Sequence, residues 1–124
     1  MKQNKETNLQ NQIRLKLSEH GIVLRLNSGQ FWQGKRVYSK ELQQDVLIHL
    51  RPVQGCPEGT SDLLFLSNNG EVAFIEVKTP TGKLKPAQER FLEIVKQMGF
   101  KAGIARSPEE ALKIVKGDDV ESGN

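Results

Sequence analysis

The sequence predicts an α/β fold in which helices flank a mixed central β-sheet. Two apolar runs joined by an Asn-Asn-Gly turn predict a β-hairpin, a helical pattern precedes it, and a helix, a strand and a second helix follow it. A chain of 124 residues, 36% of them hydrophobic, can bury one core but is too short for two. We therefore expect residues 1–124 to form a single domain, with residues 118–124 as a disordered polar tail.

The first predicted element is a helix that begins at a cap near Thr7 or Asn8 and ends at Gly21. Its apolar stripe repeats every four residues at Leu9, Ile13 and Leu17. Glu6 precedes Leu9 by three residues, so it joins the inward face if the helix extends back by one turn. A glutamate in that position is unusual for a solvated side chain.

The segment that follows is harder to assign. Residues 22–26 read as a strand, and Asn27, Ser28 and Gly29 form a polar break. Residues 31–38 fit either a hairpin or a long excursion. Residues 41–53 contain one apolar run, but its periodicity does not separate a strand from a helix.

A loop rich in glycine and proline at residues 54–60 leads into the predicted hairpin. Its strands are residues 63–66 and 71–78, and its turn contains Gly70, a residue that tolerates positive φ. The second strand is apolar on both faces, as expected for a central strand. Pro86 then starts a helix that reaches Gly99, with the apolar stripe Ala87, Phe91, Ile94, Val95 and Met98.

The chain continues with a predicted strand at residues 101–106. Ser107, Pro108 and Glu110 then form a capping box for a last helix that ends at Gly117. The formal net charge of +3 and the pI of about 9.1 make contact with a polyanion plausible without establishing it. The single cysteine, Cys56, forms no intramolecular disulfide, and the chain shows no secretory or membrane-spanning segment, so we expect a cytoplasmic protein.

Three charged residues are predicted to converge at one end of the hairpin. Glu76 and Lys78 are two residues apart on a strand, so their side chains point to the same face. Asp62 opens the preceding strand, and the turn brings the two strand ends together. Two carboxylates and a backbone carbonyl can bind a hard cation such as Mg²⁺, with Mn²⁺ as a substitute, and this set is typical of phosphodiester hydrolysis.

These motifs resemble the VRR-NUC family of the PD-(D/E)XK nuclease superfamily. The resemblance rests on Gly59-Thr60-Ser61-Asp62, on Phe74 to Thr79, and on Gly82 and Gln88, and it extends to the first helix and to Gly103–Ser107. It implies a restriction endonuclease-like core and is strongest for the short stand-alone bacteriophage members. Ser61 stands where the superfamily has its nominal proline, which weakens the superfamily match without indicating an inactive enzyme.

The resemblance also implies roles for individual residues. Asp62, Glu76 and the carbonyl of Val77 would bind the metal, Lys78 would assist catalysis, and Gln88 would support the site. Glu6 matches a helix glutamate that contributes to catalysis in many relatives. The predicted nucleic-acid contacts are Ser28, Ser61 and Lys83.

Simpler interpretations remain open for several residues. An isolated Glu-x-Lys pair can be an ion pair on an edge strand, and Gln88 can be a helix-surface residue. Glu6 can be a favourable charge at the positive end of a helix dipole, and Lys83 can belong to a solvated loop. Trp32 and Tyr38 can stack on bases or pack within the protein.

The predicted function is a Mg²⁺-dependent endonuclease acting on branched DNA such as four-way (Holliday) junctions. We expect a homodimer that uses residues 22–38 as its interface. We expect no small-molecule cofactor and no membrane partner. If a phage encodes the protein, we expect it in the cytoplasm of the host cell. The alternatives are a non-catalytic nucleic-acid-binding domain that retains the nuclease fold and a metallohydrolase for small substrates.

Overall fold

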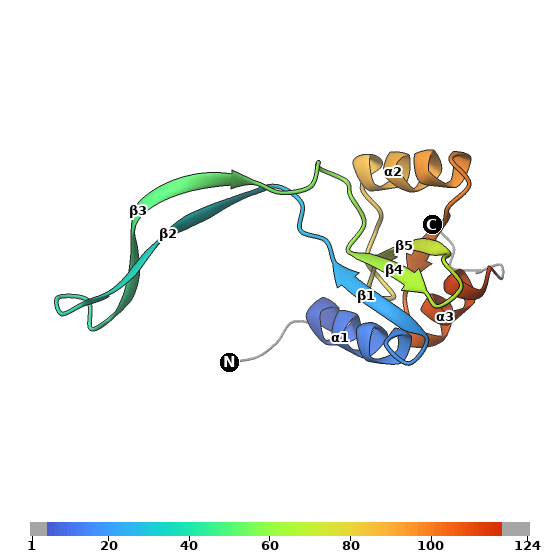
Figure 1. Ribbon diagram of the computed structural model, residues 1–124, viewed down its shortest axis with the longest axis horizontal. Helices are drawn as coiled ribbons and strands as arrows, with labels where there is room; N and C mark the ends of the chain where they lie inside the picture. Colours follow the sequence, from blue (N-terminus) through green and yellow to red (C-terminus); the bar gives the residue numbers. More distant parts are fainter. Residues whose placement is uncertain (1–4, 118–124) are drawn as a thin grey trace.

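The computed structural model describes residues 5–117 (Figure 1). In chain order the elements are α1 (Lys5–Leu17), β1 (Gly21–Arg25), β2 (Gln30–Ser39), β3 (Gln44–Gln54), β4 (Leu63–Ser67), β5 (Val72–Val77), α2 (Pro86–Gln97), β6 (Lys101–Ala105) and α3 (Pro108–Lys116). The tail expected at residues 118–124 lies outside the described residues.

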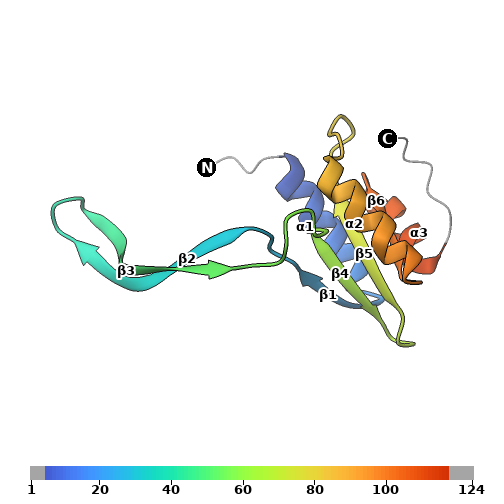
Figure 2. The same ribbon diagram turned by 90° about the horizontal axis from the view of Figure 1, so that it is seen from above.

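The main sheet has four strands in the order β1-β4-β5-β6. The pairs β1·β4 and β4·β5 are antiparallel, whereas β6 runs parallel to β5, so the predicted mixed sheet is confirmed. The predicted hairpin is β4 and β5, and Gly70 adopts the positive φ of 85° that its turn requires. Helices lie on both faces of the sheet, so the α/β class is confirmed as well (Figure 2).

The alternation of side chains along β5 divides the core between the two faces of the sheet. Ala73, Ile75 and Val77 pack with α1 and α3, where Ile13 and Leu17 are fully buried. On the opposite face Phe74 makes edge-on ring contacts with Phe91 of α2 and with Phe100, at centroid separations of 5.4 and 5.6 Å. The burial expected for β5 on both faces is therefore confirmed.

Two helix predictions need correction. Helix α1 already includes Lys5 and Glu6, so the cap predicted near Thr7 is wrong and the helix extends back as the position of Glu6 suggested. In α2 the buried residues are Leu92 and Val95, whereas Ile94 and Met98 are exposed. The predicted apolar stripe is wrong at Ile94 and Met98. Helix α2 covers only part of the sheet, so the side of the helix that carries these two residues faces solvent.

Strands β2 and β3 form a separate two-stranded sheet that projects from the rest of the molecule (Figures 1 and 2). We call residues Gln30–Gln54 the arm. The arm resolves the two segments whose structure the sequence left open. Residues 31–38 belong to a hairpin, and the apolar run at 46–48 belongs to the second strand of that hairpin. The register shifts between Gln33 and Lys35, where a side chain on Gly34 would come within 2.8 Å of the Ile48 carbonyl oxygen.

Among the described residues, no helix is both long and apolar enough to cross a membrane.

Candidate active site

The hairpin register places Asp62 beside Glu76. Leu63 pairs with Ile75, so the position before Leu63 faces the position after Ile75. Asp62 Oδ2 accepts a 2.8 Å hydrogen bond from the Val77 backbone N–H, and the Asp62 carbonyl accepts one of 2.8 Å from the Leu26 N–H. These two bonds fix the aspartate at the start of β4.

Glu76 is the least expected side chain of the site, because a carboxylate that is only 1% exposed is costly to bury. Its Oε1 accepts a 3.1 Å hydrogen bond from Gln88 Nε2 and lies 3.9 Å from Lys78 Nζ. Its Oε2 is buried and receives no hydrogen bond from a donor. The structure thus leaves one buried acceptor without a partner inside a set of polar groups.

Burial raises the pKa of Glu76 to about 9, and the adjacent Asp62 adds to this shift through its charge and through a side-chain hydrogen bond that forms only when Glu76 is protonated. Lys78 opposes the shift, while the charge of Glu6 favours it. Glu6, on the first turn of α1, is therefore close enough to Glu76 to act on it electrostatically. Two carboxylates with a third nearby make a position where a cation is strongly favoured.

Gln88 reaches the site from the start of α2. Its Nε2 donates to Glu76 while its Oε1 accepts a 2.9 Å hydrogen bond from the Lys85 backbone N–H. Both the N–H group and the oxygen of the Gln88 side-chain amide are therefore hydrogen-bonded, one to β5 and the other to the residue before α2. Gln88 is thus not a solvated residue on the helix surface.

The residues fit a hard divalent cation. Asp62 and Glu76 present carboxylate oxygens to one place, and the unpartnered Glu76 Oε2 is an acceptor that a cation would satisfy. Within residues 5–117 no group of three His, Cys, Asp or Glu side chains has metal-binding geometry. A site of two carboxylates must take its remaining ligands from backbone carbonyls and water, which suits Mg²⁺.

Comparison with known proteins decides the family. The profile of the VRR-NUC domain matches residues 4–109. The chain belongs to the VRR-NUC domain family. A solved structure titled "VRR_NUC domain" is 20% identical, with a TM-score of 0.55, and the match covers 92% of this chain and 97% of that one. No curated protein matches the chain. This VRR-NUC chain is therefore a domain of a nuclease family and shares the fold of that structure.

The three predicted nucleic-acid contacts have different surroundings in the VRR-NUC fold. Ser28 is exposed at the base of the arm, where it pairs with Cys56 in an isolated β-bridge, and Lys83 is exposed in the loop between β5 and α2. Ser61 is only 1% exposed and its Oγ donates to the Leu63 carbonyl oxygen at 3.2 Å. That side chain is therefore not available at the surface, and the nucleic-acid contact at Ser61 stays a prediction.

Sequence reasoning assigned no role to Arg106, which holds the loop after the Glu76-x-Lys78 motif. Its Nη1 donates to the carbonyl oxygens of Thr79 and Gly82 at 2.6 and 2.7 Å. The Lys78 N–H also donates to the Ala105 carbonyl at 3.1 Å. The available signal was the parallel pairing of β5 with β6, which places the residue after Ala105 level with Lys78.

We expect Arg106→Gln to lower the free energy of unfolding by about 1–2 kcal/mol, because two charge-assisted hydrogen bonds are lost at a half-buried position. Hydrogen exchange at the Gly82 amide should accelerate, since the loop loses the anchor on both its carbonyls. Arg90→Gln, at an exposed arginine of α2, is the matched control and should change neither quantity. Unchanged exchange at Gly82 in Arg106→Gln would contradict the anchoring role.

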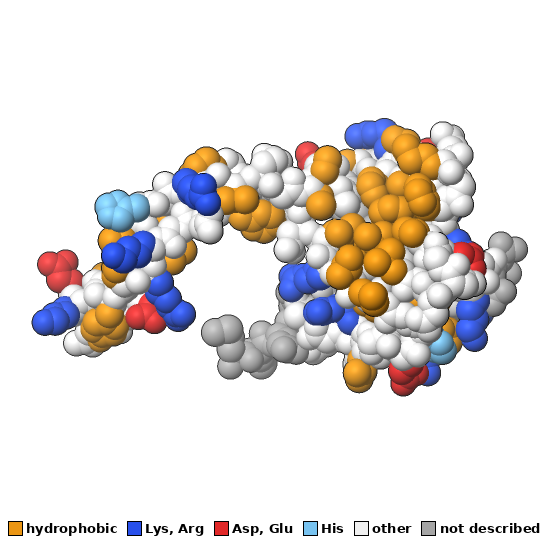
Figure 3. All heavy atoms as spheres, viewed as in Figure 1, with side chains coloured by type: hydrophobic (Ala, Val, Ile, Leu, Met, Phe, Trp, Pro, Cys, Tyr) orange, Lys and Arg blue, Asp and Glu red, His pale blue; other side chains and the backbone are white. Residues whose placement is uncertain are grey.

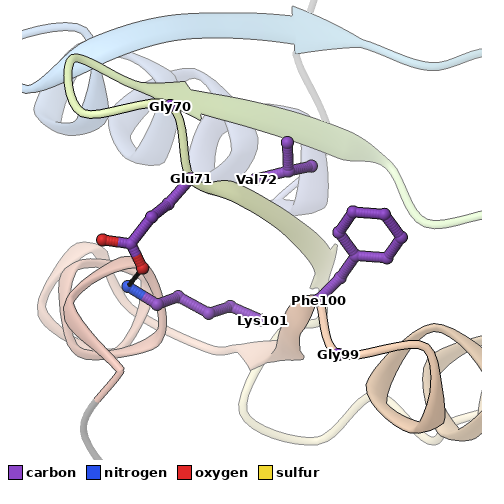
Figure 4. Close-up of a pocket in the computed structure, with 6 residues that line it drawn as sticks. All are labelled: Gly70, Glu71, Val72, Gly99, Phe100 and Lys101. Carbon is purple, nitrogen blue, oxygen red and sulfur yellow. Dashed lines mark ion pairs between the residues drawn. The ribbon is translucent and has the colours of Figure 1, made fainter.

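A pocket lies at the end of β5 opposite the candidate active site (Figure 4). It has a volume of about 250 Å³ and is lined by Gly70, Glu71, Val72, Gly99, Phe100 and Lys101. Lys101 Nζ forms a 2.6 Å ion pair with Glu71, which holds the pKa of that glutamate below its usual value. None of the candidate catalytic residues lines this pocket, so it is separate from the site described above.

Proposed function

We propose that this chain is a metal-dependent endonuclease that hydrolyses DNA phosphodiester bonds. The observation that supports this most strongly is the buried Glu76 carboxylate with an unpartnered Oε2 beside Asp62 and Lys78. A fold gains no stability from such a group, so its presence supports the proposal of a cation-binding and chemical role. The VRR-NUC family supports the same assignment at the level of a nuclease domain.

Asp62, Glu76 and the Val77 carbonyl are the proposed ligands of Mg²⁺, for which Mn²⁺ can substitute. When bound, the ion polarises a phosphate and lowers the pKa of a coordinated water. Gln88 holds Glu76 in place through its 3.1 Å hydrogen bond, and Glu6 adds negative charge that favours the cation. Gln88 thus positions a proposed metal ligand, and Glu6 makes the site more favourable for a cation. Neither residue is itself a proposed ligand.

Lys78 is the proposed catalytic cation. Its side chain is 11% exposed, so its ammonium lies in a partly desolvated position that strengthens its interaction with a phosphate. A positive charge there offsets the negative charge that builds up on the phosphate oxygens during hydrolysis, and its N–H groups can orient the attacking water. Lys83, exposed in the following loop, is a proposed phosphate contact outside the chemical centre, and Ser28 is a second proposed contact.

The second candidate is a non-catalytic nucleic-acid-binding domain that keeps the nuclease fold. Purified protein incubated with linear, flap, fork and four-way-junction DNA, with and without Mg²⁺, separates the two. Cleavage that depends on Mg²⁺ supports the nuclease, whereas DNA binding without any cleavage supports the binding domain.

The proposed working form is a homodimer that cuts branched DNA, with four-way junctions as the best substrate. Resolving a junction needs two symmetric cuts, and a two-fold dimer supplies two sites from one chain. The predicted interface, residues 22–38, includes Phe31 and Trp32, which the structure exposes on the arm. The cytoplasm is the proposed compartment, and the free Cys56 is compatible with it.

We expect a dimer by light scattering at micromolar concentration, together with cleavage of four-way junctions at least about tenfold faster than cleavage of linear duplex. The reason is that the paired sites reach both symmetric strands only on a junction. A monodisperse monomer that cuts junctions no better than linear DNA would overturn this part of the proposal and leave the nuclease assignment standing.

A further inference from the structure

One half of the main sheet is uncovered on the face where α2 lies. Helix α2 packs over β5 and β6, while α1 and α3 occupy the opposite face. The register pairs Ile22 with Leu66 and Leu24 with Leu64, so these four side chains share the uncovered half. We call them the open face. Ile22 is 60% and Leu24 is 44% exposed, and apolar side chains form a continuous patch on this side of the molecule (Figure 3).

The arm also carries apolar side chains that lack a surface to pack on, because among the described elements its two strands make extensive contacts only with each other. Its exposed apolar side chains include Phe31, Trp32, Tyr38, Leu47, Leu50 and Val53. A two-stranded hairpin with no surface to pack on is marginally stable in water. The arm therefore needs an external apolar surface.

The open face of the same chain cannot supply that surface. The base of the arm is fixed by backbone hydrogen bonds, with Gly29 N–H donating to Cys56 O at 3.1 Å, Gly55 N–H to Gly29 O at 2.8 Å and Cys56 N–H to Asn27 O at 2.8 Å. These bonds direct the arm away from the rest of the molecule in both views (Figures 1 and 2). Folding the arm back would break several of them.

We propose that the arm of one copy lies on the open face of a second copy, and that the second arm does the same in return. This inference rests on the homodimer of the proposed function and identifies the surfaces that form it. Two-fold exchange uses each arm and each open face once, so the assembly closes at two chains. A nucleic acid is not the occupant, since four aliphatic side chains offer neither cations nor hydrogen-bond donors to phosphate.

The dimensions of the arm suit this role. Strand β3 has 11 residues and spans about 36 Å at about 3.3 Å per residue, which exceeds the radius of a domain of this size. Aromatic side chains carry roughly 150–250 Å² each, so the exposed apolar side chains of the arm together offer several hundred Å². A stable interface buries about 800 Å² per partner, and two reciprocal contacts supply an area of that order.

Three variants and light scattering test the proposal. Leu24→Glu places a charge on the open face and Trp32→Glu places one on the arm, and each is expected to weaken the dimer at least about thirtyfold. Leu15→Glu is the matched control, because Leu15 is 73% exposed on α1, away from the open face, and its dimer should be unaffected. Ile22→Glu and Leu50→Glu replace the test variants if a circular dichroism melt shows no cooperative unfolding.

Mixing the two test variants distinguishes an arm on a face from an arm on an arm. A Leu24→Glu chain keeps a normal arm and a Trp32→Glu chain keeps a normal open face, so the mixture should form a heterodimer through one intact contact. Native mass spectrometry of differently tagged chains detects it. A wild-type dimer that Leu24→Glu leaves intact, or a mixture without heterodimer, overturns the inference but not the homodimer, whereas a monomeric wild type overturns both.

Discussion

Replacing Glu76 with glutamine is expected to reduce DNA hydrolysis at least about a thousandfold while the protein stays folded. The substitution keeps the shape of the side chain but removes the charge that a divalent cation requires. The fold should tolerate it, because glutamine relieves the burial of a carboxyl whose pKa is raised to about 9. Steady-state cleavage assays in Mg²⁺, together with a thermal melt, measure both effects.

DNA binding should survive Glu76→Gln, since removing a negative charge reduces repulsion of phosphate. Glu89→Gln is the matched control, because Glu89 is an exposed glutamate one residue after Gln88. The Glu89→Gln protein should cleave DNA at the normal rate. Near-normal turnover by Glu76→Gln would show that the site is misplaced.

Asp62→Asn and Lys78→Ala should each abolish hydrolysis for different reasons. Asparagine at position 62 can still accept the 2.8 Å hydrogen bond from Val77, so the strand end stays in place while a metal ligand loses its charge. Alanine at position 78 removes the only ammonium within 4.0 Å of Glu76 in the described structure. Loss of activity with a normal melt in both variants would separate chemistry from folding.

The hairpin and the residues at its end could be predicted from the sequence because local rules specify them. The period of two along β5 places Glu76 and Lys78 on one face, and the turn at Gly70 fixes the register that brings Asp62 opposite Glu76. Gln88 could be suggested because Pro86 marks where the helix starts. The catalytic roles of these residues stay predictions, while their proximity is observed.

Other features depend on contacts that no local pattern encodes. Residues 41–53 were ambiguous because a strand in an arm without a core has no buried face to impose a period of two. The burial of Ser61 and the anchoring by Arg106 follow from how the loops after β5 and before β4 pack against their neighbours. Ile94 and Met98 were assigned to the core because the sequence does not show how much of the sheet α2 covers.

Cleavage should require added Mg²⁺ or Mn²⁺ and stop completely in excess chelator. Asp62 and Glu76 cannot by themselves activate water near neutral pH, since burial and the adjacent Asp62 charge raise the pKa of Glu76 and disfavour its ionised form. A bound cation would favour the ionised form of Glu76 and would be the partner that Glu76 Oε2 lacks.

The same argument predicts a readout that does not depend on cleavage. Mg²⁺ at millimolar concentration should raise the thermal unfolding midpoint of the wild-type protein, because a ligand that binds the folded state stabilises it by mass action. The midpoint of Glu76→Gln should move much less, and that of the Glu89→Gln control should move as much as wild type. Equal shifts in wild type and Glu76→Gln would place the cation elsewhere, and undiminished cleavage by homogeneous protein in excess chelator would refute the metal-dependent mechanism itself.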